Sequence, residues 1–359
     1  MGNPGRLADL GVVRDSLLMA AVALAASSPA VWAQEKSHGG APAPLFGSDS
    51  TLTLTLTADF RAIAKDRDTI ARNPHSAVLS YTGLDARVVA LNVEVRTRGH
   101  FRLKRATCDF PPLRLTFPKA ELDKTLFERQ RSLKLVTHCD NKSAEYEQYV
   151  LQEYLVYRVY NRLTDLSFRA RLARVTYRDL VDSSARSVKY AFFIEDDQEM
   201  AKRNGTRVEK TQGARFDDLD HDQGTLLAVF EYFIGNTDWS LPYLHNIRLV
   251  RREEGSYYPV PYDFDWSGAV NTRYAKPDPR LPIRSVRERL YRGPCRTTDE
   301  LAPVFARFKQ EREAIYRLYQ EQPDLAGGNA RSTVEYFEDF YRLLDNPGRL
   351  KEQFRVACD

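Results

Sequence analysis

The sequence has few of the features that mark a specialised class of protein. Its cysteines number four in 359 residues, and none forms a CxxC pair or a Cys/His spacing, which argues against a zinc site. The 53 Lys and Arg are dispersed among 49 Asp and Glu, so we expect no binding to nucleic acid. No internal repeat is present. No apolar run after residue 33 is long enough to cross a bilayer, so we expect no membrane span in the mature chain.

The N-terminal segment is typical of an export signal. Arg6 and Arg14 precede the short apolar run 17–26 (LLMAAVALAA), and Val31 and Ala33 suit cleavage after residue 33. This pattern predicts a signal peptide over residues 1–33. Residues 34–50 are rich in Gly, Pro, Ser and Ala, which predicts a flexible leader. We therefore expect the protein to be periplasmic or secreted.

An even number of cysteines in an exported chain favours two disulfides. Cys108, Cys139, Cys295 and Cys358 allow three pairings. We favour Cys108–Cys139 and Cys295–Cys358, because each pair falls within one of the two lobes expected below. Buried free thiols are the alternative.

Strand-like alternation dominates the first part of the mature chain, and helical spacing dominates the second. The run 51–57 (TLTLTLT) alternates perfectly. Further strands are expected at 77–81, 90–96, 113–117, 132–136, 175–180 and 187–194, and helices at 145–163, 223–234, 299–320 and 332–345 with a short terminal helix. Residues 59–72 could be a helix or an irregular insert.

These patterns predict a two-lobed α+β fold. The N-terminal lobe would cover residues 51–194 and consist of a small antiparallel sheet with the helix 145–163. The C-terminal lobe would cover residues 195–359, be mainly helical and hold a metal site.

The segment 236–268, NTDWSLPYLHNIRLVRREEGSYYPVPYDFDWSG, contains the most informative polar residues. Asp238, Asn246, Asp263 and Asp265 lie on two stretches joined by an expected β-hairpin. A kinase-type phosphoryl-transfer site uses one carboxylate for the acceptor hydroxyl, then an Asn and an Asp for metal, and this order occurs here. Two carboxylates two residues apart in an extended segment also point the same way, and a cation best relieves their repulsion. Turn and capping roles are the alternatives.

A lysine and a glutamate upstream would complete such a site. Lys134 alternates with leucines on an expected strand, and Glu153 lies on the expected helix 145–163. The Lys–Glu ion pair of kinases needs a strand lysine followed by a helix glutamate, as here. Either residue could instead be an ordinary surface residue. The basic run 100–105 (HFRLKR) indicates a solvated strand edge or turn, with phosphate binding as the alternative.

Together these residues resemble the CotH (spore coat protein H) kinase-like family, whose members have an atypical protein-kinase-like fold. The resemblance extends from residue 93 to about residue 268. It is carried by VRTRGHFRLKRATCDFPPLRLTF (95–117), RSLKLVTHC, YVLQEYLVYRVYN, YAFFIEDDQEM and, most closely, GNTDWSLPYLHN…YYPVPYDFDWSG.

The resemblance implies an ATP site with Mg²⁺ or Mn²⁺ in a two-lobed protein-kinase-like fold. Lys134 would bind the phosphates and Glu153 would orient it, while Glu195 would lie near the adenine. The remaining roles would be Asp238 as the catalytic carboxylate, Asn246 and Asp263 as metal ligands, and Asp265 as a supporting carboxylate.

The sequence departs from the family pattern in two places. It has no GxGxxG phosphate loop, for which Arg98 and Gly99 are the nearest replacements, and no HRD precedes Asp238. The first hypothesis is an exported kinase that transfers phosphate from ATP to the hydroxyl of an unidentified protein. The second is a non-catalytic pseudokinase with a binding or assembly role. The third is a metal-dependent phosphohydrolase that uses Asp238, Asp263 and Asp265 without nucleotide.

Overall fold

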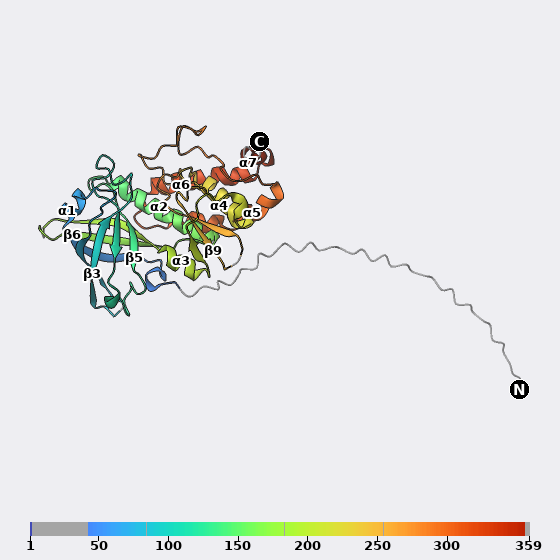
Figure 1. Cartoon of the computed structure of the whole chain (residues 1–359). Coiled ribbons are helices and arrows are strands. Elements are labelled where there is room, and N and C mark those ends of the chain that lie inside the picture. Colours follow the sequence, from blue (N-terminus) through green and yellow to red (C-terminus); the bar gives the residue numbers. More distant parts are fainter. Residues whose placement is uncertain (2–41, 84, 183, 254, 356–359) are drawn as a thin grey trace. The chain divides into compact units, whose positions relative to one another are not determined.

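The computed structural model describes residue 1 and residues 42–355, except 84, 183 and 254 (Figure 1). The predicted signal peptide and the leader up to residue 41 therefore lie outside the described residues, apart from Met1. Cys358 also lies outside them.

The first half of the described chain folds into a closed barrel of seven strands, in the order β1-β2-β3-β4-β5-β7-β6. Neighbouring strands are antiparallel except at the closure, where β1 and β6 run parallel with Leu52 opposite Ala173. The strands are β1 (Leu52–Ala58), β2 (His75–Thr82), β3 (Val88–Thr97), β4 (Leu113–Thr116), β5 (Ser132–Val136), β6 (Ala170–Asp179) and β7 (Arg186–Ile194). Every second side chain of β1, such as Leu54 and Leu56, is buried in the barrel core, as its alternation predicts.

Helices and a small sheet account for most of the regular structure outside the barrel. The helices are α1 (Phe60–Lys65), α2 (Ala144–Leu163), α3 (Asp197–Arg203), α4 (His221–Ile234), α5 (Thr298–Gln320), α6 (Gly327–Leu344) and α7 (Pro347–Arg355). A three-stranded sheet has the order β10-β9-β8, with β8 (Arg207–Glu209), β9 (Ile247–Arg251) and β10 (Tyr257–Pro261). Short 3₁₀ turns occur at Pro44–Phe46, Lys119–Glu121 and Phe216–Asp218. The β-hairpin expected within the segment 236–268 is confirmed by the pairing of β9 with β10.

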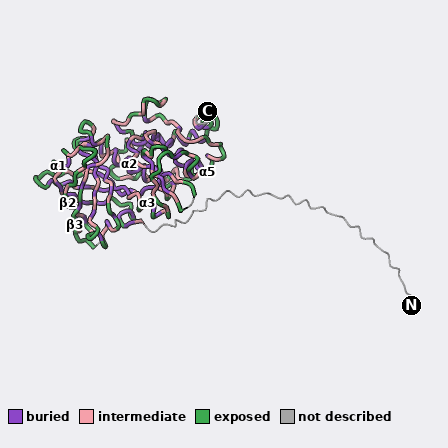
Figure 2. The backbone as a smooth tube through the Cα atoms, in the orientation of Figure 1, coloured by how far each residue is buried: buried purple, intermediate pink, exposed green. Residues whose placement is uncertain are grey.

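The predicted two-lobed kinase-like fold is wrong. The strands form a closed mixed barrel instead of a small antiparallel sheet, because β1 pairs in parallel with β6. The helix α2 is buried on most of its faces and shares one hydrophobic core with β7, α4 and α5 (Figure 2). Phe192, Phe230 and Phe308 belong to that core. Because α2 lies between the barrel and the later helices, the described residues from 42 onward belong to one unit.

Residues 42–50 differ from the flexible leader expected there. Leu45 and Phe46 are buried in the barrel's hydrophobic cluster. The Arg171 guanidinium donates hydrogen bonds to the carbonyl oxygens of Leu45 at 3.3 Å and Ser48 at 2.5 Å. This part of the expected leader is therefore anchored to β6.

The predicted Cys108–Cys139 disulfide is confirmed. It joins the β3–β4 loop to the segment after β5. Cys295 is disulfide-bonded, but its predicted partner Cys358 lies outside the described residues, so that pairing stays a prediction. Disulfides persist in oxidising compartments, so the bond is compatible with export. None of the helices in the described ranges is long and apolar enough to span a membrane.

Candidate functional site

Three carboxylates meet where α2 passes the segment that follows β10. Glu153 of α2 and Asp265 are buried, with 2% and 6% of their surface exposed. Burial raises the pKa of Glu153 well above its ordinary value, and the charges of Asp265 and Asp263 add to the shift. Burial and the charge of Asp263 likewise raise the pKa of Asp265 to about 7. Asp263 is half-buried, and its charge is close enough to the two buried carboxylates to raise the pKa of each.

A hard cation fits this cluster in chemical terms. Glu153 Oε1 is buried and has no hydrogen-bond partner among the described residues, although buried polar atoms nearly always have one. Carboxylate and amide oxygens are the protein ligands that Mg²⁺ and Mn²⁺ prefer. In the described ranges, no group of three or more Asp, Glu, His or Cys side chains is placed so that it could hold a metal ion by itself. A cation here would thus also need oxygens from an amide, water or substrate phosphate.

Two arginines from the β3–β4 loop face the carboxylates. Arg102 Nη1 lies 4.0 Å from Asp265 Oδ2, and its Nη2 donates to the carbonyl oxygen of Thr137 at 2.6 Å. Burial lowers the pKa of Arg98, while the nearby charge of Asp263 opposes that shift. Arg102 was not predicted as a site residue. Its only signal in the sequence was the basic run 100–105, for which phosphate binding was the alternative interpretation.

Two tyrosines hold the segment that carries Asp263 and Asp265. The hydroxyl of Tyr157 on α2 accepts a hydrogen bond from the backbone N–H of Asp263 at 2.9 Å. The hydroxyl of Tyr274 donates to Asp265 Oδ2 at 2.8 Å. Asp263 has a φ of 65°, so the segment is not the extended one expected from its sequence. The carboxylates meet through a left-handed turn after β10 ends at Pro261.

Asp238 and Asn246 are brought together, as their places in one short segment suggested. Asn246 Nδ2 donates to the backbone oxygen of Asp238 at 2.7 Å and to its Oδ2 at 3.1 Å. His245 Nε2 lies 3.1 Å from Asp238 Oδ1, and this hydrogen bond raises the pKa of His245. The Asp238 side chain is 38% exposed and accessible to solvent. Its charge also raises the pKa of Asp265, so it lies beside the carboxylate cluster.

Gly235 fixes the turn that presents Asp238. It ends α4 with a φ of 66°, in the left-handed region that favours glycine. A Cβ at this position would lie 2.0 Å from the hydroxyl of Tyr336, so any other residue would displace the Tyr336 ring. The loop that follows α4 therefore needs a glycine at its start, both for the positive φ and for the lack of room for a side chain.

Lys134 does not form the predicted ion pair with Glu153. Its Nζ donates to Asp197 Oδ1 at 3.4 Å and lies 4.7 Å from the centre of the Tyr262 ring. Arg248 binds the other oxygen of Asp197 at 2.5 Å. Burial lowers the pKa of Lys134, and the carboxylate of Asp197 opposes the shift. Asp197, at the start of α3, is the carboxylate that pairs with Lys134 instead. A pocket of about 60 Å³ opens beside this group.

Glu195 forms a structural ion pair. Its two carboxylate oxygens each accept a hydrogen bond from Arg203 at 3.0 Å, and one also accepts the backbone N–H of Arg169 at 3.0 Å. The residue is 2% exposed. Its side chain is therefore already engaged, and we do not assign it to adenine binding.

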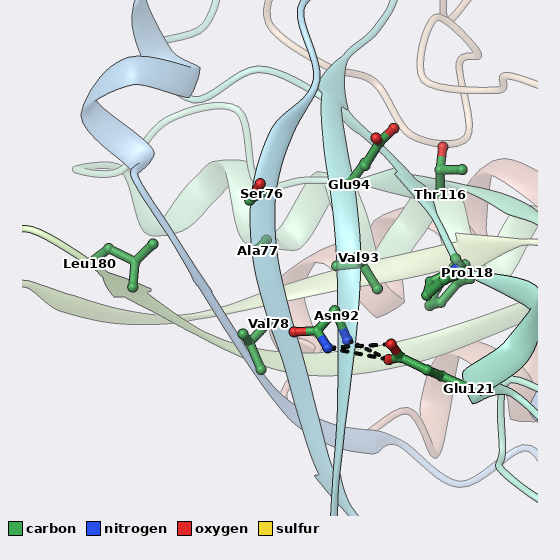
Figure 3. Close-up of a pocket in the computed structure, with 11 residues that line it drawn as sticks. Ser76, Ala77, Val78, Asn92, Val93, Glu94, Thr116, Pro118, Glu121 and Leu180 are labelled. Carbon is green, nitrogen blue, oxygen red and sulfur yellow. Dashed lines mark hydrogen bonds between the residues drawn. The ribbon is translucent and has the colours of Figure 1, made fainter.

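A larger pocket of about 550 Å³ lies over β2, β3 and β4 and is separate from this cluster (Figure 3). Its lining residues are Ser76, Ala77, Val78, Asn92, Val93, Glu94, Thr116, Phe117, Pro118, Glu121 and Leu180. Asn92 is bound there to the carboxylate of Glu121 through its backbone N–H at 3.1 Å. None of the predicted site residues lines this pocket.

Most of the predicted residues lie in or beside one charged cluster. The charges of Asp263, Asp265 and Arg98 act on Glu153, and those of Asp263 and Asp238 act on Asp265. Asn246 is bound to Asp238, and Lys134 is close enough to Arg98 for that cation to lower its pKa further. Glu195 is bound to Arg203 but lines the small pocket beside Lys134.

Comparison with known proteins adds no identification, because no family model matches the chain and no curated protein matches its sequence.

Proposed function

We propose that the protein is an exported phosphotransferase that binds ATP with Mg²⁺ or Mn²⁺ and transfers a phosphate to the hydroxyl of another protein. One observation carries the proposal. Three mutually repelling carboxylates, Glu153, Asp263 and Asp265, lie directly beside the cations Arg98 and Arg102. Oxygen ligands for a hard cation and positive groups for phosphates are the two requirements of a metal–triphosphate site.

Asp263, Asp265 and Asn246 would hold the metal ion. The amide nitrogen of Asn246 is committed to Asp238, so its amide oxygen is the atom that would face a cation. When bound, the ion would neutralise charge on the phosphates and on the carboxylates together. Tyr157 and Tyr274 would keep the two carboxylates in place. The Tyr157 hydroxyl accepts a hydrogen bond from the backbone N–H of Asp263, and the Tyr274 hydroxyl donates one to the Asp265 carboxylate, and neither hydroxyl adds a charge to the site.

Arg98 and Lys134 would bind the phosphates. Burial removes water from both side chains, and this loss of hydration lowers the pKa of each. An anion that replaces water at such a site interacts strongly with them. Lys134 is bound to Asp197 at 3.4 Å, a long contact for a charged pair, so it can serve a phosphate with little change in position.

Asp238 would accept the proton of the acceptor hydroxyl. Asn246 fixes its orientation from one side and His245 from the other. The raised pKa of His245 favours the protonated imidazole beside Asp238, which stabilises the carboxylate form that a general base needs. The exposed part of Asp238 is where a hydroxyl of a protein substrate can approach.

A non-catalytic binding role at the same site is the second candidate. This alternative is supported by the partner of Lys134, which pairs with Asp197 and not with Glu153. Lys134 and Glu153 therefore do not form the Lys–Glu ion pair of active kinases. Such a protein would bind ATP with metal but transfer no phosphate.

The resemblance to the CotH family supports the assignment of these roles, and membership of that family is part of the proposal. The protein-kinase-like fold is not part of the proposal, because the strands form a closed barrel. Export by cleavage after residue 33 is likewise proposed from the sequence, since that segment lies outside the described residues.

Calorimetric titration and a transfer assay would test the proposal. Mature protein is incubated with Mn²⁺ and labelled ATP, alone and with a generic acceptor protein, and Asp263→Ala is compared with the exposed control Asp123→Asn. We expect transfer by the native protein and by the control. We expect Asp263→Ala to weaken metal-dependent ATP binding at least about tenfold.

Three other results would change the conclusion. Binding without transfer would favour the non-catalytic role. Metal-stimulated hydrolysis of a simple phosphoester that is indifferent to Lys134→Ala would favour a phosphohydrolase. Absence of transfer together with unchanged binding in Asp263→Ala would refute the proposal.

A further inference from the structure

The β3–β4 loop, residues 98–112, is fixed more firmly than surface loops usually are. Arg67, just after α1, donates three hydrogen bonds, of 2.6 to 3.1 Å, to carbonyl oxygens of the loop at Leu103, Cys108 and Asp109. Arg72 donates to the carbonyl oxygen of Gly99 at 2.8 Å. The Cys108–Cys139 disulfide adds a covalent tie to the segment after β5.

The same loop packs against the carboxylate segment. The ring of Phe101 meets Trp266 edge-on, with centroids 5.0 Å apart, and lies 5.7 Å from Tyr274. Gly99 has a φ of 82°, which permits the chain to turn directly after Arg98. The loop therefore places two arginines over the carboxylates with its backbone held from several sides.

Both arginines have donors without acceptors. The Nε atoms of Arg98 and Arg102 are buried and have no hydrogen-bond partner within the described part of the chain. Their guanidinium groups are the planar donors that match phosphate oxygens best. A bound polyphosphate would supply the acceptors that these atoms lack.

We propose that this loop is the phosphate-binding loop of the site, with Arg102 as a phosphate ligand beside Arg98 and the Cys108–Cys139 disulfide as the tie that positions both. The inference rests on the proposed function. It gives the loop the role that a glycine-rich loop has in kinases, with fixed guanidinium donors in place of backbone N–H groups. Cys108 and Cys139 are 1% and 2% exposed, so the disulfide is a permanent tie and not an accessible switch.

Titration of mature protein with ATP and with adenosine, each with Mn²⁺, tests the role of Arg102. We expect Arg102→Gln to weaken ATP binding by about ten- to a hundredfold, because it loses charge-assisted hydrogen bonds. Adenosine, which has no phosphate, should bind Arg102→Gln and the native protein equally. The matched control is Arg105→Gln, an exposed position on the same loop, which should leave both affinities unchanged. Equal weakening by both substitutions would overturn the inference.

Two further variants test whether the Cys108–Cys139 disulfide and Arg67 position the loop. The pair Cys108→Ser and Cys139→Ser should show the same selective loss of ATP affinity. If that variant does not fold, Arg67→Gln keeps the disulfide but frees three loop carbonyls, and it should show a smaller loss of the same kind. Unchanged ATP affinity in Arg67→Gln and in a folded serine variant would refute the positioning role.

The test also separates this inference from the proposed function. If the native protein binds no ATP with Mn²⁺, the proposed function fails. Titration with inorganic tripolyphosphate and Mn²⁺ then decides the loop's role. Binding that depends on Arg102 would support it, and absence of binding would overturn it.

Discussion

Replacing Asp265 with asparagine should make the metal-free protein more stable above neutral pH. Asp265 is buried next to Asp263, and its pKa is raised from an ordinary value of 3.8 to about 7. The folded state therefore holds a proton on Asp265 over a pH range in which the unfolded state has released it. Because the unfolded state binds fewer protons there, the free energy of unfolding falls as pH rises from about 4 to about 7.

The size of the effect follows from the shift. A difference of about three pKa units corresponds to about 4 kcal/mol at 1.36 kcal/mol per unit, which is the full contribution above pH 7. Between pH 5 and pH 8 the native protein should lose about 3 kcal/mol through Asp265. Asparagine has the same shape, cannot ionise and can still accept the hydrogen bond from Tyr274. The Asp265→Asn variant should lack this part of the pH dependence.

Urea unfolding at pH 5 and pH 8, in the presence of a chelator, measures the free energy of unfolding of the native protein and of Asp265→Asn. We expect Asp265→Asn to exceed the native protein in stability at pH 8 and to approach it at pH 5. Added Mn²⁺ should stabilise the native protein more than the variant, because the variant has lost a ligand. The exposed control Asp123→Asn should follow the native protein throughout. Native stability that does not fall between pH 5 and pH 8, or a variant whose stability falls over this range as steeply as that of the native protein, would refute this account.

Three other predictions concern separate parts of the molecule. Asp238→Asn should reduce phosphate transfer at least about a hundredfold, seen in initial rates, while ATP affinity in calorimetry stays the same; normal rates would exclude it as the base. Removing the disulfide, which closes 31 residues, should lower the free energy of unfolding by about 4 kcal/mol in urea titration; no change would contradict its structural role. Glu195→Gln should cost about 3–5 kcal/mol because it leaves buried Arg203 without its charge partner. A selective loss of ATP affinity in that variant would restore Glu195 to the nucleotide site.

Local patterns in the sequence were sufficient for single elements but not for their assembly. The alternation of residues 51–57 predicts β1, and the apolar spacing of residues 145–163 predicts α2. Neither pattern indicates that β1 would pair in parallel with β6, because that choice depends on two strands far apart in the chain. The apolar residues on most faces of α2 were the one available sign that it would be enclosed from both sides.

The same division applies to the candidate site. Asp238 and Asn246 could be joined from sequence because they are close in one segment. The partner of Lys134 could not be predicted, because Asp197 reaches it only through the fold. Arg102 was passed over because a short basic run is usually a solvated surface. What distinguishes it is the burial of its guanidinium beside Asp265, which only the tertiary structure supplies.

The closure of the barrel also has a consequence for the order of folding. β1 and β6 are separated by about 120 residues, and contacts of such range form late because a long loop must close first. Until β6 is in place, β1 and β7 each present an unpaired strand edge, and open edges promote aggregation. A chain shortened before residue 170 would retain β1 to β5 as an open sheet. We therefore expect such fragments to aggregate, and we expect the chain to need protection until β6 and β7 have been made.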